Sequence, residues 1–195
     1  MGRSRAYDED VVLTGAMHAF RRQGYAAVSI RDLEEATGLK AGSIYNSFGD
    51  KAGLFASAFA HYNRAVLRGR IAEHASAAAG LRGLRDLFLS LLREPKGESF
   101  GCLITNSAIE FGGEGRPPAG VREGLKVLSE TFVERLSSAR TAGVLRHETD
   151  PILTAARLLA FYQGILVLVR ARHDKAALKR LINSEFDTLE EQHDA

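Results

Sequence analysis

Two short helical patterns separated by a glycine-containing turn lie in residues 28–51, VSIRDLEEATGLKAGSIYNSFGDK. Ser29 and Asp32 have the spacing of a capping box at the start of the first pattern. Gly38 supplies, at no steric cost, the backbone angles that a tight turn requires. This arrangement predicts a helix-turn-helix, in which the first helix braces the DNA backbone and the second enters the major groove.

The spacing of apolar residues divides each predicted helix into an inner and an outer side. The inner side of the first helix is expected to hold Ile30, Leu33 and Ala36. Leu39 and Ile44 are expected to lock the second helix against the first. The outer side of the second helix then carries side chains that hydrogen-bond phosphates and base edges, namely Ser43, Tyr45, Asn46 and Ser47.

The charge of the chain does not by itself indicate a nucleic-acid partner. The net charge is +2, and residues 1–51 contain seven basic and seven acidic residues. A nucleic-acid footprint usually shows a clear basic excess. The positions of the charges are more informative: Lys40 and Lys51 bracket the second helix, and Arg3 and Arg5 lie in an N-terminal arm. An ordinary solvated surface remains the alternative for these charges.

The rest of the 195-residue chain also has helical periodicity and contains only 4 Pro. Helices are expected over residues 8–23, from 51 into the Ala-rich stretch before Gly80, and over 81–91, 101–111, 121–143, 151–172 and 178–189, with breaks at 95–97 and 112–120. Without convincing strand alternation or internal repeats, this pattern predicts an all-α protein with about nine helices.

The single Cys fits a reducing compartment. No uninterrupted apolar stretch of bilayer length or signal peptide is seen, which predicts a cytoplasmic protein without a membrane segment.

Residues 11–59 resemble the TetR family of transcriptional regulators. The resemblance is carried by QGY (residues 23–25), VSIRDLEEATGL and GSIYNSFGDKAGLF (42–55). It implies a helix-turn-helix DNA-binding domain at residues 1–50 and a helical ligand-binding and dimerisation domain at 51–195. The implied function is a repressor that binds a quasi-palindromic double-stranded DNA operator as a homodimer and is released by a small-molecule effector, without a cofactor or metal.

The resemblance also implies roles for individual residues of the N-terminal domain. Tyr45 would reach the DNA backbone, with Ser43 and Asn46 close to bases or phosphates, Lys51 paired with a phosphate, Ser29 capping the helix beside the backbone, and Phe48 anchoring the second helix. Three positions depart from the family pattern: Lys40 replaces a Ser or Thr cap, which costs about 1 kcal/mol, Ala41 stands where a basic residue is common, and Ser47 replaces a frequent His. The alternatives are a Tyr45 packed between helices and a Lys51 that is a solvated helix start.

The C-terminal helices are expected to form the dimer and to enclose the effector. The apolar positions of the last two helices exceed what a one-sided surface helix needs. The expected dimer contacts are Phe161, Gly164, Ile165, Leu168, Leu181, Ile182 and Phe186. The expected effector-binding residues are Tyr62, Phe88, Cys102, Asn106, Glu110, Phe132, Tyr162 and Gln163. Residues of both sets could instead belong to the core of one subunit.

Cys102 opens the stretch GCLITNSA at a predicted helix start. Gly-Cys-Leu at this place resembles a branch of the family that includes electrophile- and redox-responsive repressors. A helix N-terminus favours a reactive thiolate. The alternative is that Cys102 is a small buried apolar residue, as free Cys residues commonly are.

Two other classes of protein compete with this interpretation. An enzyme is not indicated, because GGEGRPP (112–118) lacks the Lys-Ser/Thr ending of a phosphate loop and no catalytic fingerprint occurs. The six His show no paired helical spacing that would indicate a zinc site. A helical adaptor that binds a protein through its C-terminal helices remains the second alternative.

Overall fold

The computed structural model describes residues 7–93, 100–113, 115 and 117–190. Within these ranges the regular elements are helices, and Leu145 and Glu190 form an isolated β-bridge, so the all-α prediction is confirmed. The expected arm with Arg3 and Arg5 and the expected break at 95–97 lie outside the described residues. Contacts divide the chain into unit 1 (residues 1–67 and 102–123) and unit 2 (residues 68–101 and 124–195).

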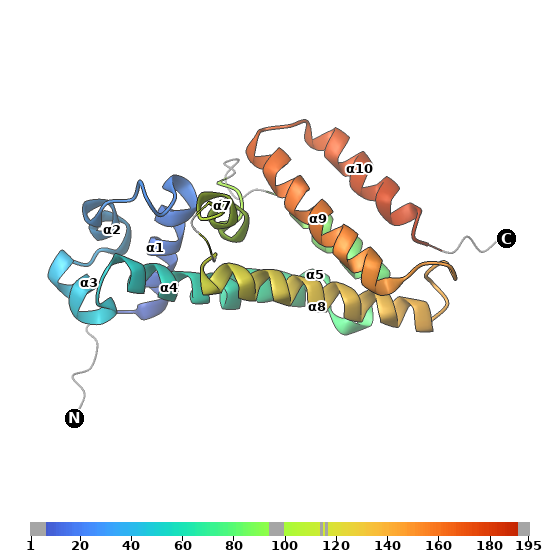
Figure 1. Cartoon of the computed structure of the whole chain (residues 1–195), viewed down its shortest axis with the longest axis horizontal. Coiled ribbons are helices and arrows are strands. Elements are labelled where there is room, and N and C mark those ends of the chain that lie inside the picture. The colour runs from blue at the N-terminus through green and yellow to red at the C-terminus, as the bar shows by residue number, and fades with distance from the viewer. Residues whose placement is uncertain (1–6, 94–99, 114, 116, 191–195) are drawn as a thin grey trace, which may run out of the picture. The chain divides into compact units, whose positions relative to one another are not determined.

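Unit 1 contains the predicted helix-turn-helix. Its elements are α1 (Glu9–Gln23), α2 (Ile30–Thr37), α3 (Ala41–Phe48), α4 (Lys51–His61), the π-helical segment η1 (Tyr62–Leu67), α7 (Leu103–Glu110) and the first residues of α8 (Ala119–Thr141). Figure 1 labels the α-helices among them. Helix α1 packs against α2, α4 and α7, and α3 packs against α2 and α4. The helix-turn-helix is therefore held between α1 and α4.

Local capping explains where the helices of unit 1 begin. The Asp8 carboxylate accepts hydrogen bonds from the amides of Asp10 and Val11, and the Asp50 carboxylate accepts one from the amide of Gly53. The predicted capping box of Ser29 and Asp32 is present at the start of α2. Gly38 ends α2 in the left-handed conformation with φ 71°. Each of these contacts satisfies a backbone group that a helix end leaves unpaired.

Helices α1 and α2 meet at a contact that only glycine allows. A Cβ atom placed on Gly15 would lie 2.0 Å from the carbonyl oxygen of Ala36. The prediction that Ala36 belongs to the inner side of α2 is wrong, because its side chain is exposed. The buried side chains of α2 are Leu33 and Thr37, since α1 approaches the Ala36 position through its backbone.

An aromatic cluster forms the core of unit 1 behind the helix-turn-helix. The Phe55 ring lies 4.9 Å from the Phe20 ring and 4.9 Å from the Tyr25 ring, measured between centroids. Phe59 and Phe111 extend the cluster at 5.5 Å from Phe55 and from Tyr25, respectively. These rings join the end of α1, helix α4 and the residue that follows α7, so α7 is part of the core beneath the helix-turn-helix.

The predicted long helix after Lys51 contains a π-helical segment. Helices α4 and α5 (Arg68–His74) form one continuous run through η1. A π segment accommodates an additional residue per turn and changes the direction of the side chains that follow. Within η1, Asn63 donates a hydrogen bond from Nδ2 to the Gly120 carbonyl at 2.9 Å, and the Tyr62 hydroxyl lies 3.1 Å from Cys102 Sγ. The segment therefore fixes the starts of α7 and α8 within unit 1.

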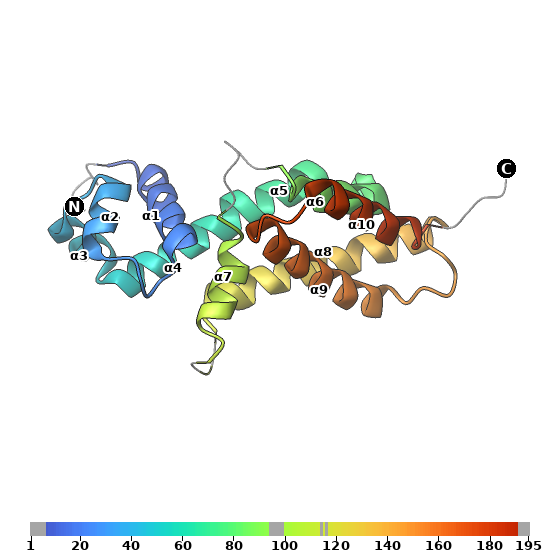
Figure 2. The same cartoon turned by 90° about the horizontal axis from the view of Figure 1, so that it is seen from above.

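Unit 2 consists of helices that follow the predicted boundaries closely. They are α5, the 3₁₀ turn η2 (Ala77–Ala79), α6 (Gly80–Ser90), the remainder of α8, α9 (Pro151–Arg170) and α10 (Lys175–Asp187). Asp150 caps α9 ahead of Pro151, and Asp174 caps α10. Helix α6 packs against α5 and α10, and Figure 2 shows α6 beside α10.

Phe88 is the centre of the core of unit 2. Its ring has aromatic neighbours at centroid distances of 5.2–5.7 Å, which are Phe132, Phe161, Tyr162 and Phe186. Phe186 therefore belongs to the core of its own subunit. Ile165 and Ile182 are also buried within the subunit. The three expected dimer contacts Ile165, Ile182 and Phe186 thus offer no accessible surface to a partner in this conformation.

The described residues form ten α-helices, of which α4 and α5 are joined through η1, so nine separate α-helical runs result, in agreement with the prediction of about nine. The units are divided differently from the predicted domains 1–50 and 51–195, because α4 packs with α1 and α3, and α7 packs with α1. Contact units need not coincide with functional domains, and the domain limits stay a prediction.

Helix α9 is long and apolar enough for a membrane span by length and composition alone, a criterion that core helices also meet.

Candidate nucleic-acid interface

Helix α3 begins without a cap from its own N-cap residue. Lys40 occupies that position and makes no side-chain capping hydrogen bond, as its departure from the family pattern predicted. Glu34 of α2 replaces the missing cap, because its Oε1 accepts a hydrogen bond from the Ala41 amide at 2.8 Å. A carboxylate at a helix start also interacts favourably with the helix dipole. The sequence analysis did not identify this role of Glu34.

The outer face of α3 carries the polar residues that the sequence predicted for it. Ser43, Tyr45 and Asn46 are exposed, Ser47 is partly exposed, and Lys40 is exposed just before the helix. The Tyr45 side chain is 47% exposed, which excludes the alternative in which it is packed between helices. Ile44 is fully buried and fixes α3 from the opposite side. The helix therefore presents hydrogen-bonding groups on a surface that its own packing holds in place.

Lys51 is placed at the start of α4 by a specific set of contacts. Its Nζ lies 4.8 Å from the centroid of the Tyr25 ring and donates a hydrogen bond of 3.4 Å to the Ala26 carbonyl. A cation held over an aromatic face is attracted by the ring quadrupole. Lys51 is thus neither a freely solvated helix start nor buried, and its ammonium group is directed by the turn that follows α1.

Ser29 supports the start of α2 through its capping box with Asp32. Its hydroxyl donates to Asp32 Oδ2 at 2.6 Å and accepts from the Asp32 amide at 3.1 Å. The Ser29 hydroxyl first and its backbone amide second hold the pKa of Asp32 below the ordinary value, with smaller contributions from Arg31 and Lys51. Ser29 is exposed, as a residue near a DNA backbone must be.

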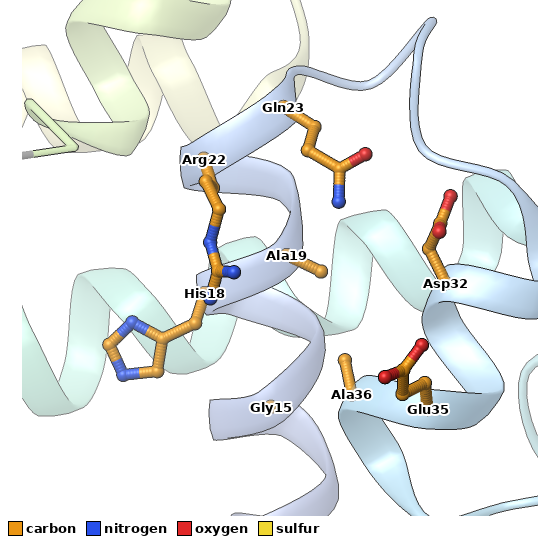
Figure 3. Close-up of a pocket in the computed structure, with 8 residues that line it drawn as sticks. All are labelled: Gly15, His18, Ala19, Arg22, Gln23, Asp32, Glu35 and Ala36. Atoms are coloured by element: carbon orange, nitrogen blue, oxygen red, sulfur yellow. The ribbon is translucent and has the colours of Figure 1, made fainter.

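A polar cleft of about 330 Å³ is lined by residues of α1 and α2 beside their close crossing (Figure 3). Figure 3 shows Gln23 directed from α1 toward Asp32, whereas the His18 ring is turned away from α2. Burial lowers the pKa of His18, and Arg21 and Arg22 lower it further. The lining carries charges of both signs, with Asp32 and Glu35 on α2 and Arg22 on α1. Among the described residues no group of three His, Cys, Asp or Glu could hold a metal ion.

Helix α7 is bound to the end of α1 and to the turn after it by two side chains that the sequence assigned to the effector site. The Glu110 carboxylate accepts hydrogen bonds from the amides of Tyr25 at 2.9 Å and Ala26 at 2.7 Å. Asn106 donates from Nδ2 to the Arg21 carbonyl at 3.1 Å. Both residues therefore connect α7 to α1 and the turn that follows it within unit 1, a role that sequence periodicity gave no signal for.

The other expected effector residues fall into two groups. In unit 1 the buried Tyr62 and Cys102 contact each other, and Cys102 is the N-cap residue of α7 and 5% exposed. In unit 2 the rings of Phe88, Phe132 and Tyr162 contact one another in the core, in tilted and edge-to-face arrangements. Gln163 is partly exposed on α9. The assignment of these residues to an effector site stays a prediction.

Both parts of the chain match known families. Residues 12–58 match the bacterial regulatory proteins of the tetR family, and residues 77–184 match the tetracyclin repressor-like C-terminal domain. An uncharacterized HTH-type transcriptional regulator of Bacillus subtilis (strain 168), YezE, is 32% identical over 164 residues, which is 82% of this chain and 84% of YezE. The HTH-type transcriptional repressor ComR of Escherichia coli (strain K12) is 27% identical over 192 residues, which is 96% of this chain and 90% of ComR.

A solved structure extends the likeness to nearly the whole chain. It is a cysteine-substituted form of the TetR family transcriptional regulator CifR in complex with a 26-base-pair double-strand operator DNA. The likeness has a TM-score of 0.81 and 25% sequence identity, and covers 96% of this chain and all of that one. These relatives are transcriptional regulators and not enzymes. The family matches at both ends of the chain, together with the capped helix-turn-helix, establish that the chain belongs to the TetR family of bacterial transcriptional regulators.

Proposed function

We propose that the chain is a transcriptional repressor that binds a quasi-palindromic DNA operator as a homodimer and is released by a small molecule. The observation that carries the proposal is the exposed polar face of α3 on a helix-turn-helix whose buried side is fixed by Ile44 and Leu33. The operator complex of CifR and the repressor name of ComR support it. Because DNA is its partner, we place the protein in the cytoplasm.

On the operator, α3 would lie in the major groove. Ser43, Asn46 and Ser47 would hydrogen-bond bases or phosphates, and Tyr45 would donate to the DNA backbone. Ser29 and Lys40 would contact phosphates beside the groove. Lys51 would pair with a phosphate while the Tyr25 ring supports its ammonium group from the other side. Exposure of these side chains and the directed placement of Lys51 support this arrangement.

The dimer would use the exposed apolar side of α9 and α10. A stripe of exposed small and apolar residues follows one side of α9, consisting of Leu153, Ala156, Ala160, Gly164 and Val167. A Cβ on Gly164 would meet no atom within 4 Å, so another helix can approach there. Leu181 is exposed on α10, and Phe161 and Leu168 are partly exposed. Of the dimer contacts expected from the sequence, we retain the accessible ones, which are Phe161, Gly164, Leu168 and Leu181.

DNA binding is tested by measuring the affinity of the purified protein for a duplex that it selects from a random-sequence pool. We expect affinity to fall steeply with salt, because released counterions accompany phosphate contacts. Tyr45→Ala and Lys51→Ala should each weaken binding at least fivefold without changing the thermal unfolding midpoint. Arg82→Ala, which removes an exposed charge on α6, is the matched control and should bind as wild type does.

Two results would overturn the proposal. One is wild-type affinity in both the Tyr45→Ala and Lys51→Ala variants, which would remove α3 and α4 from the interface. The other is the recovery of no duplex at low salt, which would favour the adaptor alternative. The dimer is tested separately by sedimentation of Val167→Arg, which places a charge in the exposed stripe of α9. A Val167→Arg protein that stays dimeric would move the interface elsewhere.

A further inference from the structure

A cavity of about 400 Å³ opens in unit 1 between α4, the residue after α7 and the start of α8. Aromatic rings form its walls, and these are Tyr25, Phe55, Phe59 and Phe111. Small residues on the exposed side of α4, among them Ala56, leave its mouth open. None of the lining residues belongs to the effector site expected from the sequence, so the cavity is a separate feature of the molecule.

The walls of this cavity are formed in advance by contacts among the rings themselves. Tyr25 lies 4.9 Å from Phe55 and 5.5 Å from Phe111, and Phe55 lies 5.5 Å from Phe59. The backbone of α8 closes one side directly on Phe59, since a Cβ on Gly120 would lie 2.4 Å from Phe59 Cδ1. Preformed aromatic walls around a volume in the range of small-molecule sites favour a flat apolar ligand.

The charge of the lining residues restricts the ligand further. They include one acidic side chain, Glu123, and no Lys, Arg or His. A carboxylate beside an apolar cavity disfavours an anion that has to leave water. We propose that this cavity binds an uncharged planar aromatic molecule, and that its occupation changes DNA binding through Tyr25. The second part rests on the proposed function, whereas the first part does not.

Tyr25 connects the cavity to the predicted phosphate contact. One part of its ring lines the cavity, and the ring also supports the Lys51 ammonium group at 4.8 Å. The backbone of Tyr25 and Ala26 is held by Glu110 on one side and by Lys51 at the Ala26 carbonyl on the other. A ligand that packs against the Tyr25 ring therefore acts directly on the group that positions Lys51.

The site is tested with the neutral fluorescent probe N-phenyl-1-naphthylamine and the full-length protein. We expect saturable binding of one probe per chain. Ala56→Phe fills the cavity with a ring and should weaken binding at least tenfold. Ala72→Phe adds the same ring at an exposed position of α5, on the same continuous helical run, and should bind as wild type does. An absence of saturable binding, or equal binding by wild type and Ala56→Phe, would overturn the site.

The preference of the cavity for an uncharged ligand is tested with 1-anilinonaphthalene-8-sulfonate, a probe that has the same ring skeleton and carries a sulfonate. We expect the neutral probe to bind at least tenfold more tightly than the anionic one. Glu123→Gln changes an exposed residue and should not affect folding. It should tighten the anionic probe severalfold and leave the neutral probe unchanged. Equal affinities of the two probes, with no effect of Glu123→Gln, would refute the preference for an uncharged ligand.

The link to DNA is measured separately. Saturating neutral probe should change the affinity of wild type for its selected duplex at least threefold, and should leave the affinity of Ala56→Phe unchanged. If Ala56→Phe weakens probe binding as expected but saturating probe leaves the DNA affinity of wild type unchanged, the link through Tyr25 is refuted. A wild-type protein that binds probe but no DNA would instead refute the proposed function and leave the cavity assignment standing.

Discussion

Gly15 is the residue at which a single methyl group tests the packing of the DNA-binding unit most directly. The Gly15→Ala substitution places a Cβ 2.0 Å from the Ala36 carbonyl oxygen, whereas ordinary contacts begin at 3.4 Å. Because the obstacle is backbone and not a flexible side chain, α1 and α2 have to separate by about 1.4 Å (3.4 minus 2.0) at this point. This separation moves α2, and with it the cap that Glu34 provides for α3.

The change in the free energy of unfolding of Gly15→Ala follows from two opposing effects. Overpacking costs about 1–3 kcal/mol, and the rigid obstacle places Gly15→Ala near the upper end of that range. The higher helix propensity of Ala returns about 1 kcal/mol. The net loss of stability is then about 2 kcal/mol, which lowers the unfolding midpoint by about 4–8 °C for a chain of this size. Gly69→Ala on α5 is the control, because a Cβ there meets no atom within 4 Å. It should raise the midpoint by about 2–4 °C.

The assay is thermal unfolding followed by circular dichroism, with all three proteins at the same concentration. The two substitutions add the same methyl group to a helical glycine, so opposite signs of their effects isolate the contact with Ala36. A Gly15→Ala protein as stable as wild type, or stabilised like Gly69→Ala, would refute the close crossing of α1 and α2. We also expect Gly15→Ala to weaken DNA binding, since α3 depends on the position of α2.

Three further predictions concern capping, acid stability and the thiol. Glu34→Ala should reduce the free energy of unfolding by about 1 kcal/mol in urea titrations, because the Ala41 amide loses its cap, whereas Glu35→Ala should change it by less than about 0.5 kcal/mol. The lowered pKa of Asp32 means that its contribution to stability is present above the ordinary value of 3.8 and is lost as the pH falls through the lowered value, so Asp32→Asn should flatten the acid side of the stability profile. A profile that Asp32→Asn leaves unchanged would contradict this assignment. Native Cys102 should react with 5,5′-dithiobis(2-nitrobenzoate) much more slowly than the unfolded protein, since its thiol is buried against Tyr62. Rapid native reaction would favour the sensor interpretation.

Helix positions were predictable because they depend on local signals. Ser29 caps α2 through the predicted capping box, and the helix starts expected at residues 8, 51 and 151 agree with those of α1, α4 and α9 to within one residue. The π segment at 62–67 was not predictable, because its residues have good helical periodicity and its cause is tertiary. Tyr62 and Asn63 contact residues that lie 40 and 57 positions later in the chain.

The candidate interface was predictable to the extent that it depends on exposure. The outer positions of α3 follow from a period of 3.6 once Ile44 is recognised as buried. The support of the interface was not predictable, because Glu34 and Glu110 are charged residues on helical surfaces, where most such residues are solvated. Their hydrogen bonds to Ala41, Tyr25 and Ala26 depend on how neighbouring helices cross. Periodicity does not contain that information.

The contacts of the turn after α1 suggest a route by which an effector changes DNA binding without contacting the DNA-binding residues themselves. Glu110 holds the amides of Tyr25 and Ala26, and Lys51 holds the ring of the first and the carbonyl of the second. The same two-residue turn is therefore bound by α7 on one side and by the predicted phosphate contact on the other. A displacement of α7 that breaks the two Glu110 hydrogen bonds leaves two amides without their acceptor, so the turn has to follow α7 or rearrange. In either case Lys51 loses its present support, and its fit to a phosphate changes.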